Sequence, residues 1–161
     1  MKRNEHLKTL SWEHHHGLVS AFRLQQGLNN GTAKDTLRDY ILYIWENDLD
    51  FHFWKEEQII QPSLVKTEDG KKIVEQMTSE HKTFRNLIKT LKTKQHKIEH
   101  IRFFADILNK HIRFEERRLF PFIEKESSEK ALEKIGDFLE EHYTPSCNEW
   151  QPRFWVNSGN E

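Results

Sequence analysis

One pattern occurs twice in this chain and constrains its fold more than any other feature. A histidine is followed four residues later by a pair of glutamates and, five residues after the pair, by a proline. The two copies are His52, Glu56, Glu57 and Pro62, and His111, Glu115, Glu116 and Pro121. A weaker pair, Glu13-His14 and Glu80-His81, has apolar residues four positions before and seven after each histidine. An internal repeat indicates a repeated structural unit, so we predict two copies of one helical hairpin.

Long stretches rich in Leu, Ile, Lys, Glu and Gln favour helices over strands. Glycine and proline are scarce and fall where helices would stop, notably at Gly31, Pro62, Gly70 and Pro121. Between these breaks the apolar residues recur at spacings of three and four, as they do on one face of a helix. We expect helices over about residues 5–29, 33–60, 68–93, 97–120 and 128–142.

Four long amphipathic helices joined by short connections predict an all-α fold. The expected architecture is an up-down-up-down antiparallel four-helix bundle with a short C-terminal fifth helix and an aromatic tail. We expect one domain over residues 1–143, with the tail, residues 144–161, packed on the bundle so that it buries Phe154 and Trp155. The tail is alternatively a docking strip for a partner or a lid over a pocket.

Composition excludes several classes of function. Charged residues make up 32% of the chain but nearly cancel to a net charge of −1, so neither nucleic acid nor membrane is an expected partner. No apolar stretch is long enough for a membrane span or a signal peptide, so we expect a cytoplasmic protein. The lone cysteine, Cys147, excludes an intramolecular disulfide and is interpreted as an incidental thiol.

Histidines and glutamates interrupt the apolar faces of the predicted helices. Because residues four apart share a helix face, each H-x-x-x-E copy directs an imidazole and a carboxylate to one point. The first and third helices add one inward histidine each, and in the run His14-His15-His16 the apolar register favours His14. Six candidate metal ligands result: His14, His52, Glu56, His81, His111 and Glu115.

A metal is expected because buried carboxylates need neutralisation. Leaving one unpaired in an apolar core costs on the order of several kcal/mol, and here two would be buried beside four imidazoles. A pair of cations would neutralise them, with each carboxylate able to bridge both ions and the histidines in terminal positions. Imidazole and carboxylate without thiolate favour iron, manganese or zinc.

These residues resemble the hemerythrin-like family, also called the HHE cation-binding domain. The resemblance covers about residues 5–123 and rests on His14, the H-x-x-x-E at His52, Glu80-His81 and the H-x-x-x-E-E-x-x-L-F-P at His111. It implies a four-helix bundle holding two iron ions bridged by two carboxylates, with manganese or zinc as alternatives. Members bind dioxygen, sense oxygen or redox state, handle nitric oxide or peroxide, or take part in iron homeostasis. A small diatomic ligand or peroxide is therefore the implied partner.

The chain departs from the oxygen-carrying members in two places. They have a second histidine one turn after the first in the third helix, where this chain has Arg85. They also have an aspartate five residues after the histidine of the fourth helix, where this chain has Glu116. These departures argue against reversible oxygen carriage, unless a side chain such as His15 or His142 completes the site.

Several alternatives stay open at this level. Glu57 and Glu116 either accept hydrogen bonds from ligand histidines or lie on solvated helix faces. The side chains of His6, His96 and His100 are expected at the surface. A metal- or oxygen-binding protein is favoured over an enzyme. The alternatives are a di-iron oxidase, ferroxidase or peroxidase-like enzyme, and a metal-free helical interaction module.

Overall fold

The computed structural model describes residues 2–146 and 149–157, and within them every regular element is a helix. The prediction of an all-helical chain is confirmed. The elements in chain order are the 3-10 turn η1 (Glu5–Leu7), α1 (Lys8–Asn29), α2 (Lys34–Ile44), the π-helical turn η2 (Trp45–Leu49), α3 (Asp50–Ile59), α4 (Gln61–Leu64), α5 (Glu68–Leu91), α6 (Ile98–Phe114), the π-helical turn η3 (Glu115–Leu119), α7 (Phe120–Glu126) and α8 (Glu129–Glu141).

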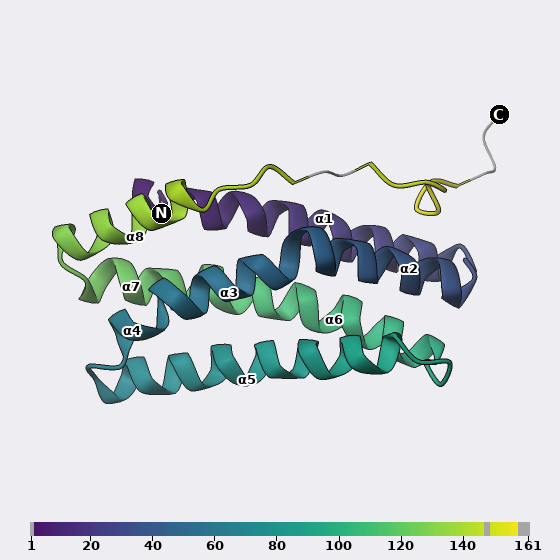
Figure 1. The fold of residues 1–161 in the computed structure, drawn as a ribbon, viewed down its shortest axis with the longest axis horizontal. Helices are drawn as coiled ribbons and strands as arrows, with labels where there is room; N and C mark the ends of the chain where they lie inside the picture. Colours follow the sequence, from purple (N-terminus) through teal and green to yellow (C-terminus); the bar gives the residue numbers. More distant parts are fainter. Residues whose placement is uncertain (1, 147–148, 158–161) are drawn as a thin grey trace.

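The long helices lie side by side along the long axis of the molecule (Figure 1). The α1–α2 and α5–α6 connections are at one end, while α4, α8 and the N-terminus are at the other. Helix α6 packs against α1, α2 and α5. The described residues thus form a helical bundle whose interior is reached by side chains from several helices.

Local sequence sets several of the helix boundaries. Thr67 precedes α5 and its side chain accepts a hydrogen bond from the N–H of Gly70, while Ser128 precedes α8 and accepts from the N–H of Ala131. Such a cap satisfies an otherwise free donor and stabilises a helix by about 1 kcal/mol. Gly31, in the α1–α2 turn, has a φ of 69°, a left-handed conformation that glycine adopts without steric cost.

The helix expected over 33–60 is α2, η2 and α3 in one continuous run. Within η2 the N–H of Asp50 donates to the carbonyl of Trp45, five residues earlier instead of four. A turn with one extra residue rotates the residues after it by about 100° around the helix axis. The face that α3 presents to the interior is therefore set partly by η2.

The helix expected to end near residue 120 continues through η3 and α7 to Glu126, so the predicted stop at Pro121 was wrong. Proline has no N–H and normally leaves a carbonyl of the preceding turn without a donor. Here the N–H of Phe120 donates to the carbonyl of Glu115, and the next carbonyl, that of Glu116, accepts from the Arg3 guanidinium at 2.9 Å. The wider turn and the arginine together allow the helix to continue past the proline.

The apolar core is divided into two clusters along the bundle. One cluster contains Leu10 of α1 and Met77 of α5, and the other contains Ala21 of α1 and Phe84 of α5. The inward histidines of these helices, His14 and His81, lie between the two clusters in sequence. A polar layer thus lies between the two apolar clusters. No helix of the described residues is long and apolar enough to cross a membrane.

His96 was expected at the surface, but its side chain is buried. Its Nε2 lies 2.7 Å from Oδ1 of Asp35 and its Nδ1 lies 2.7 Å from the carbonyl oxygen of Thr93. Both ring nitrogens have an acceptor, which offsets the cost of burial. The side chain joins the α5–α6 connection to the start of α2.

The aromatic tail runs back along α1 and α2 (Figure 1). Phe154 is buried, its carbonyl accepts from Asn30 at 2.9 Å, and the Arg23 guanidinium lies 4.2 Å from the ring centre of Trp155. A Cβ on Gly27 would come within 2.5 Å of the Phe154 ring, so this close approach requires glycine. Cys147 lies outside the described residues, as do residues 148 and 158–161 of the predicted tail.

Candidate metal centre

Four helical segments and one π-helical turn contribute to one buried polar layer. The contributing side chains are His14 from α1, His52 and Glu56 from α3, His81 from α5, His111 from α6 and Glu115 from η3. None is more than 5% exposed, and both carboxylates are 0% exposed. The structure therefore brings together all six side chains that the sequence predicted as ligands.

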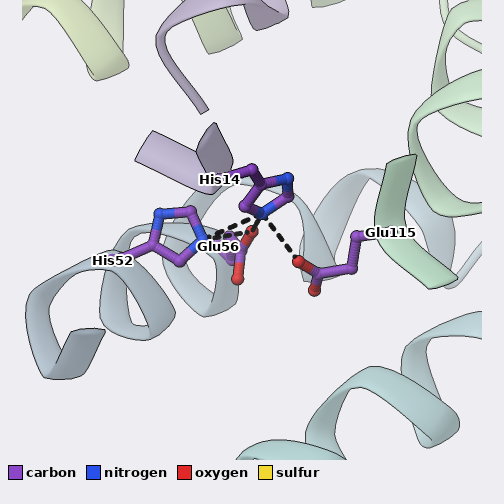
Figure 2. A group of neighbouring side chains, drawn as sticks. All are labelled: His14, His52, Glu56 and Glu115. Carbon is purple, nitrogen blue, oxygen red and sulfur yellow. Dashed lines mark hydrogen bonds and ion pairs between the residues drawn. The ribbon is translucent and has the colours of Figure 1, made fainter. Parts of the chain in front are cut away.

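The six side chains form two groups that share their carboxylates. His14, His52, Glu56 and Glu115 make the first group, and Glu56, His81, His111 and Glu115 make the second. In each group the potential ligand atoms all lie within 4.8 Å of one another. Figure 2 shows the first group, in which Nε2 of His14 is 3.0 Å from Glu115 and Nε2 of His52 is 3.0 Å from Glu56. We name these groups the first and second half-sites.

The second half-site is built in the same way around the other two imidazoles. Nε2 of His81 is 3.3 Å from Oε2 of Glu56, and Nε2 of His111 is 3.3 Å from Oε1 of Glu115. Each carboxylate thus directs oxygen atoms to both half-sites.

Several of the converging atoms have no hydrogen bond. Both carboxylate oxygens of Glu56 and Glu115, and Nε2 of His81 and His111, are buried without a hydrogen-bonding partner. Each such group costs on the order of 1–3 kcal/mol in a folded protein, and more when it is charged. A cluster of unsatisfied oxygen and nitrogen donors that face one another is the arrangement that a cation would complete.

A second ring of carboxylates holds the outer nitrogen of every imidazole. Nδ1 of His52 lies 2.6 Å from a carboxylate oxygen of Glu13, and Nδ1 of His111 lies 2.6 Å from one of Glu80. Nδ1 of His14 lies 2.8 Å from a carboxylate oxygen of Glu116, and Nδ1 of His81 lies 2.8 Å from one of Glu57. A carboxylate only accepts, so each Nδ1 carries a hydrogen, and in a neutral imidazole Nε2 then presents a lone pair to the interior. This is the second layer that metal-binding histidines commonly have.

The family comparison agrees with this geometry. Residues 8–123 match the family described as the Hemerythrin HHE cation binding domain. The chain belongs to this family. No curated protein and no solved structure shows significant similarity to the chain. Within this hemerythrin HHE domain, the described residues include two buried His/Glu groups with the geometry to hold a metal ion.

In the metal-free hemerythrin HHE domain, the imidazoles themselves would neutralise the carboxylates. Burial lowers the pKa of His52, but the negative charge of Glu56 and the hydrogen bond to Glu13 outweigh it and raise the pKa to about 9. Burial likewise opposes protonation of His81, but the neighbouring carboxylates of Glu56 and Glu57 outweigh it and raise the pKa to about 9. The site is therefore built to hold positive charge, as protons or as metal ions.

The outer ring resolves the question of Glu57 and Glu116. Both hydrogen-bond to inward histidines, and neither is a purely solvated residue. Hydrogen bonding to His81 is the largest cause that lowers the pKa of Glu57 to about 2. For Glu116, burial opposes ionisation but hydrogen bonds to His14 and Ser11 lower the pKa to about 2.

Two members of the outer ring were not predicted in this role. Glu13 and Glu80 appeared in the sequence only as a shared signature, each directly before an inward histidine. In the structure each one holds a histidine of a different helix, since Glu13 of α1 reaches His52 of α3 and Glu80 of α5 reaches His111 of α6. Their repetition beside the histidines was the available signal, but their partners depend on helix pairing.

The other candidates lie away from the two half-sites. His15 is exposed, and Nδ1 of His142 donates to the carbonyl of Phe138 in α8. Arg85 stands where oxygen carriers have a further histidine, and its guanidinium pairs with Glu57 at 2.8 and 3.1 Å. No further histidine of the described residues joins either half-site, so each has two imidazoles and the two shared carboxylates.

Proposed function

We propose that this chain is a non-haem di-iron protein that binds or senses dioxygen or a related small oxidant such as nitric oxide or peroxide, or takes part in iron homeostasis. His14, His52, His81 and His111 would be terminal ligands, and Glu56 and Glu115 would bridge the two ions. Manganese and zinc accept the same donors. The proposal includes the up-down-up-down antiparallel four-helix topology and, because the only cysteine gives no disulfide framework, a cytoplasmic location.

One observation carries the proposal: the two half-sites share Glu56 and Glu115, whose four oxygens are buried without hydrogen bonds. A single ion would leave half of this donor set uncompensated. When bound, iron supplies an open coordination position and a reversible change of oxidation state.

The chain's own residues orient the ligands and limit access of water. Glu13, Glu57, Glu80 and Glu116 hold the imidazole rings through Nδ1, so that each Nε2 points into the layer where a metal would bind. The ring of Phe120 stacks on His14 at 5.1 Å, and that of Phe53 stacks on His81 at 4.0 Å. Each of these apolar rings covers one face of an imidazole.

Elemental analysis of protein purified without added metal tests the proposal directly. We expect about two equivalents of iron per chain. The His111→Ala variant tests a buried ligand, and the His15→Ala variant is its control at an exposed histidine. Only His111→Ala should lose metal, and both variants should keep their helix content. Absence of metal, together with no gain in thermal stability on reconstitution, would contradict the proposal and favour the metal-free interaction module.

A binding protein and an enzyme would use the same residues, so the function within the di-iron class needs a separate experiment. Ferrous protein prepared without oxygen is exposed to air, and the absorption spectrum and oxygen consumption are followed. A reversible, stoichiometric spectral change supports binding or sensing. Repeated turnover, with oxidation of added ferrous iron or a peroxide-dependent reaction, supports the oxidase, ferroxidase or peroxidase-like alternative.

A further inference from the structure

Each carboxylate of the outer ring has a further side-chain partner besides its histidine. These partners are Lys55 for Glu13, Arg85 for Glu57, Gln76 for Glu80, and Arg3 together with Ser11 for Glu116. All but Arg3 belong to α1, α3 or α5, helices that also carry inner ligands. Arg3 instead precedes α1 and lies outside residues 8–123, the part of the chain that matches the family. The hold on Glu116 therefore depends in part on a segment beyond the matched domain.

This segment, residues 2–7, which we name the N-terminal arm, is fixed on the end of the bundle. Oε1 of Glu124 in α7 accepts hydrogen bonds from the backbone N–H of Asn4 and from the Arg3 guanidinium, both at 2.9 Å. Leu7 is buried, and the turn η1 packs against α8. Arg3 is thus held in place by contacts other than the one that reaches the outer ring.

Arg3 contacts both the side chain and the backbone of Glu116. Its Nη2 donates to Oε2 at 2.8 Å and to the backbone carbonyl at 2.9 Å. The other carboxylate oxygen, Oε1, accepts from Ser11 at 2.7 Å and lies 2.8 Å from Nδ1 of His14. Rotation of the carboxylate away from the imidazole would therefore break charge-assisted hydrogen bonds at both oxygens. The guanidinium also lies 5.1 Å from the ring centre of Phe120, which stacks on His14.

The corresponding contact at the second half-site has a local origin. Arg85 pairs with Glu57, the carboxylate that holds His81. Arg85 follows His81 by four residues in α5, so one helix face carries both side chains. A helix that places His81 therefore places its supporting arginine as well, whereas α1 does not contain Arg3.

We propose that Arg3 is a positioning residue of the first half-site, which fixes the carboxylate of Glu116 and through it directs the imidazole of His14 into the metal layer. The inference rests on the proposed metal centre. It makes the first half-site dependent on the N-terminal arm, whereas the outer ring of the second half-site is complete within the matched domain. The competing role is a purely structural one, in which Arg3 only supplies a donor for the backbone carbonyl of Glu116 near Pro121.

The hydrogen on Nδ1 of His14 tests the contact without any metal. Protein with 15N-labelled histidine is kept with a chelator, and exchange of the ring N–H hydrogens with solvent is measured by NMR, with His14→Gln and His81→Gln to assign the signals. We expect Arg3→Gln to speed exchange at His14 by about tenfold, because the carboxylate that holds the ring loses a charged partner. Exchange at His81 should change by less than about twofold, since it shares no partner with Arg3. Arg85→Gln is the matched control and should give the opposite pattern.

A double-mutant cycle separates positioning from backbone support. Zinc is the probe, because it accepts the same donors and does not change its oxidation state. Competition with a chelator measures zinc affinity of wild type, Arg3→Gln, Glu116→Ala and the double variant. We expect Arg3→Gln to weaken affinity by about tenfold in the wild-type background and by less than about twofold in the Glu116→Ala background, where no carboxylate is left to fix. Support of the backbone carbonyl alone would give the same loss in both backgrounds.

The outcomes separate this inference from the metal centre itself. Unchanged exchange at His14 in Arg3→Gln, or an equal loss of zinc affinity in both backgrounds, overturns the positioning role and leaves the proposed function intact. A wild-type protein that binds neither iron nor zinc contradicts the proposed function, and the ring N–H exchange still shows whether Arg3 holds His14. If Arg3→Gln does not fold, Arg3→Lys decides. An ammonium lacks the fork that spans Glu116 and Glu124, so exchange at His14 should rise by about threefold or more, and unchanged exchange overturns the role.

Discussion

The two half-sites have the same inner groups and different surroundings. Each has two imidazoles and shares both carboxylates, and each imidazole is held through Nδ1 by an outer glutamate. Beyond this ring the likeness ends, because Glu13 pairs with the buried Lys55 whereas Glu80 bonds to Gln76. The inner geometry follows the repeat in the sequence, while the surroundings distinguish one side of the centre from the other.

The helices that carry the half-sites differ as well. In the first copy the π-helical turn η2 precedes His52, and in the second the turn η3 begins at Glu115, after His111. A chain that repeats its ligands therefore need not repeat the path of its backbone. In both copies an imidazole and a carboxylate point inward, but the π-helical turn lies at a different position relative to them.

The shared carboxylates should give the largest effect. Glu115→Gln keeps the size of the side chain but removes a charge that faces both half-sites, so we expect loss of nearly all metal at both positions. Elemental analysis measures the loss, and circular dichroism checks that helix content is retained. Full metal occupancy in this variant would show that the half-sites do not depend on a common carboxylate.

Single histidine variants should separate the half-sites. His52→Ala removes a donor from the first and His111→Ala from the second, so each is expected to retain about one equivalent of metal or less. The comparison is sharpest when both variants are titrated with iron under the same conditions. Equal and complete loss in both would mean that the two ions bind only together.

The outer ring should give an intermediate effect that differs between the halves. Glu80→Gln weakens the hold on His111, and the expected loss of metal affinity is about 10- to 100-fold. Glu13→Gln should cost more, since it also leaves the ammonium of Lys55 without its carboxylate. Competition with a chelator measures both affinities. A smaller effect for Glu13→Gln would remove the distinction drawn between the two surroundings.

The pH dependence of the metal-free protein tests both half-sites together. His52 and His81 have folded-state pKa values raised to about 9, above the ordinary value of about 6.5. Their protonation therefore stabilises the fold fully below about pH 6.5, and this stabilisation is lost as the pH rises through about 9. We expect the Tm measured with a chelator to fall by about 5–10 °C over this window.

Variants assign that pH dependence to each half. His52→Gln and His81→Gln should each reduce the fall in Tm, because each removes one of the groups that takes up a proton. Metal affinity should change in the opposite direction, rising with pH, because ligand nitrogens must lose their protons to bind. A Tm of the metal-free protein that rises between about pH 6.5 and 9 would contradict the assignment.

The aromatic tail should give the smallest effect on metal. Phe154 packs on Gly27 and Leu37 of the first hairpin, away from the six inner side chains. Phe154→Ala is expected to lower the free energy of unfolding by about 2–4 kcal/mol, measured by denaturant titration. Metal content should remain at the wild-type level. A loss of metal in this variant would connect the tail to the centre.

Much of the fold and the inner site could be predicted from the sequence. The spacing of His52 to Glu56 and of His111 to Glu115 is local, and a helix converts it into a shared face without any knowledge of tertiary structure. The stop expected at Pro121 failed because the carbonyl that the proline leaves free is satisfied by Arg3, which is far away in the chain. The burial of His96 was missed for the same kind of reason, since its partner Asp35 lies in α2, far away in the chain.

The sequence by itself determined the helices, the repeat and the six inner side chains, because periodicity and i to i+4 spacing are properties of one helix at a time. Only the tertiary structure decided which glutamate holds which histidine and what Arg85 does. These contacts depend on how the helices pack against one another. Packing brings together residues that are far apart in the chain, and their spacing in the sequence does not reveal the contact. The repeated segments at His52 and His111 are thus alike in sequence, and they acquire different surroundings only through the helices around them.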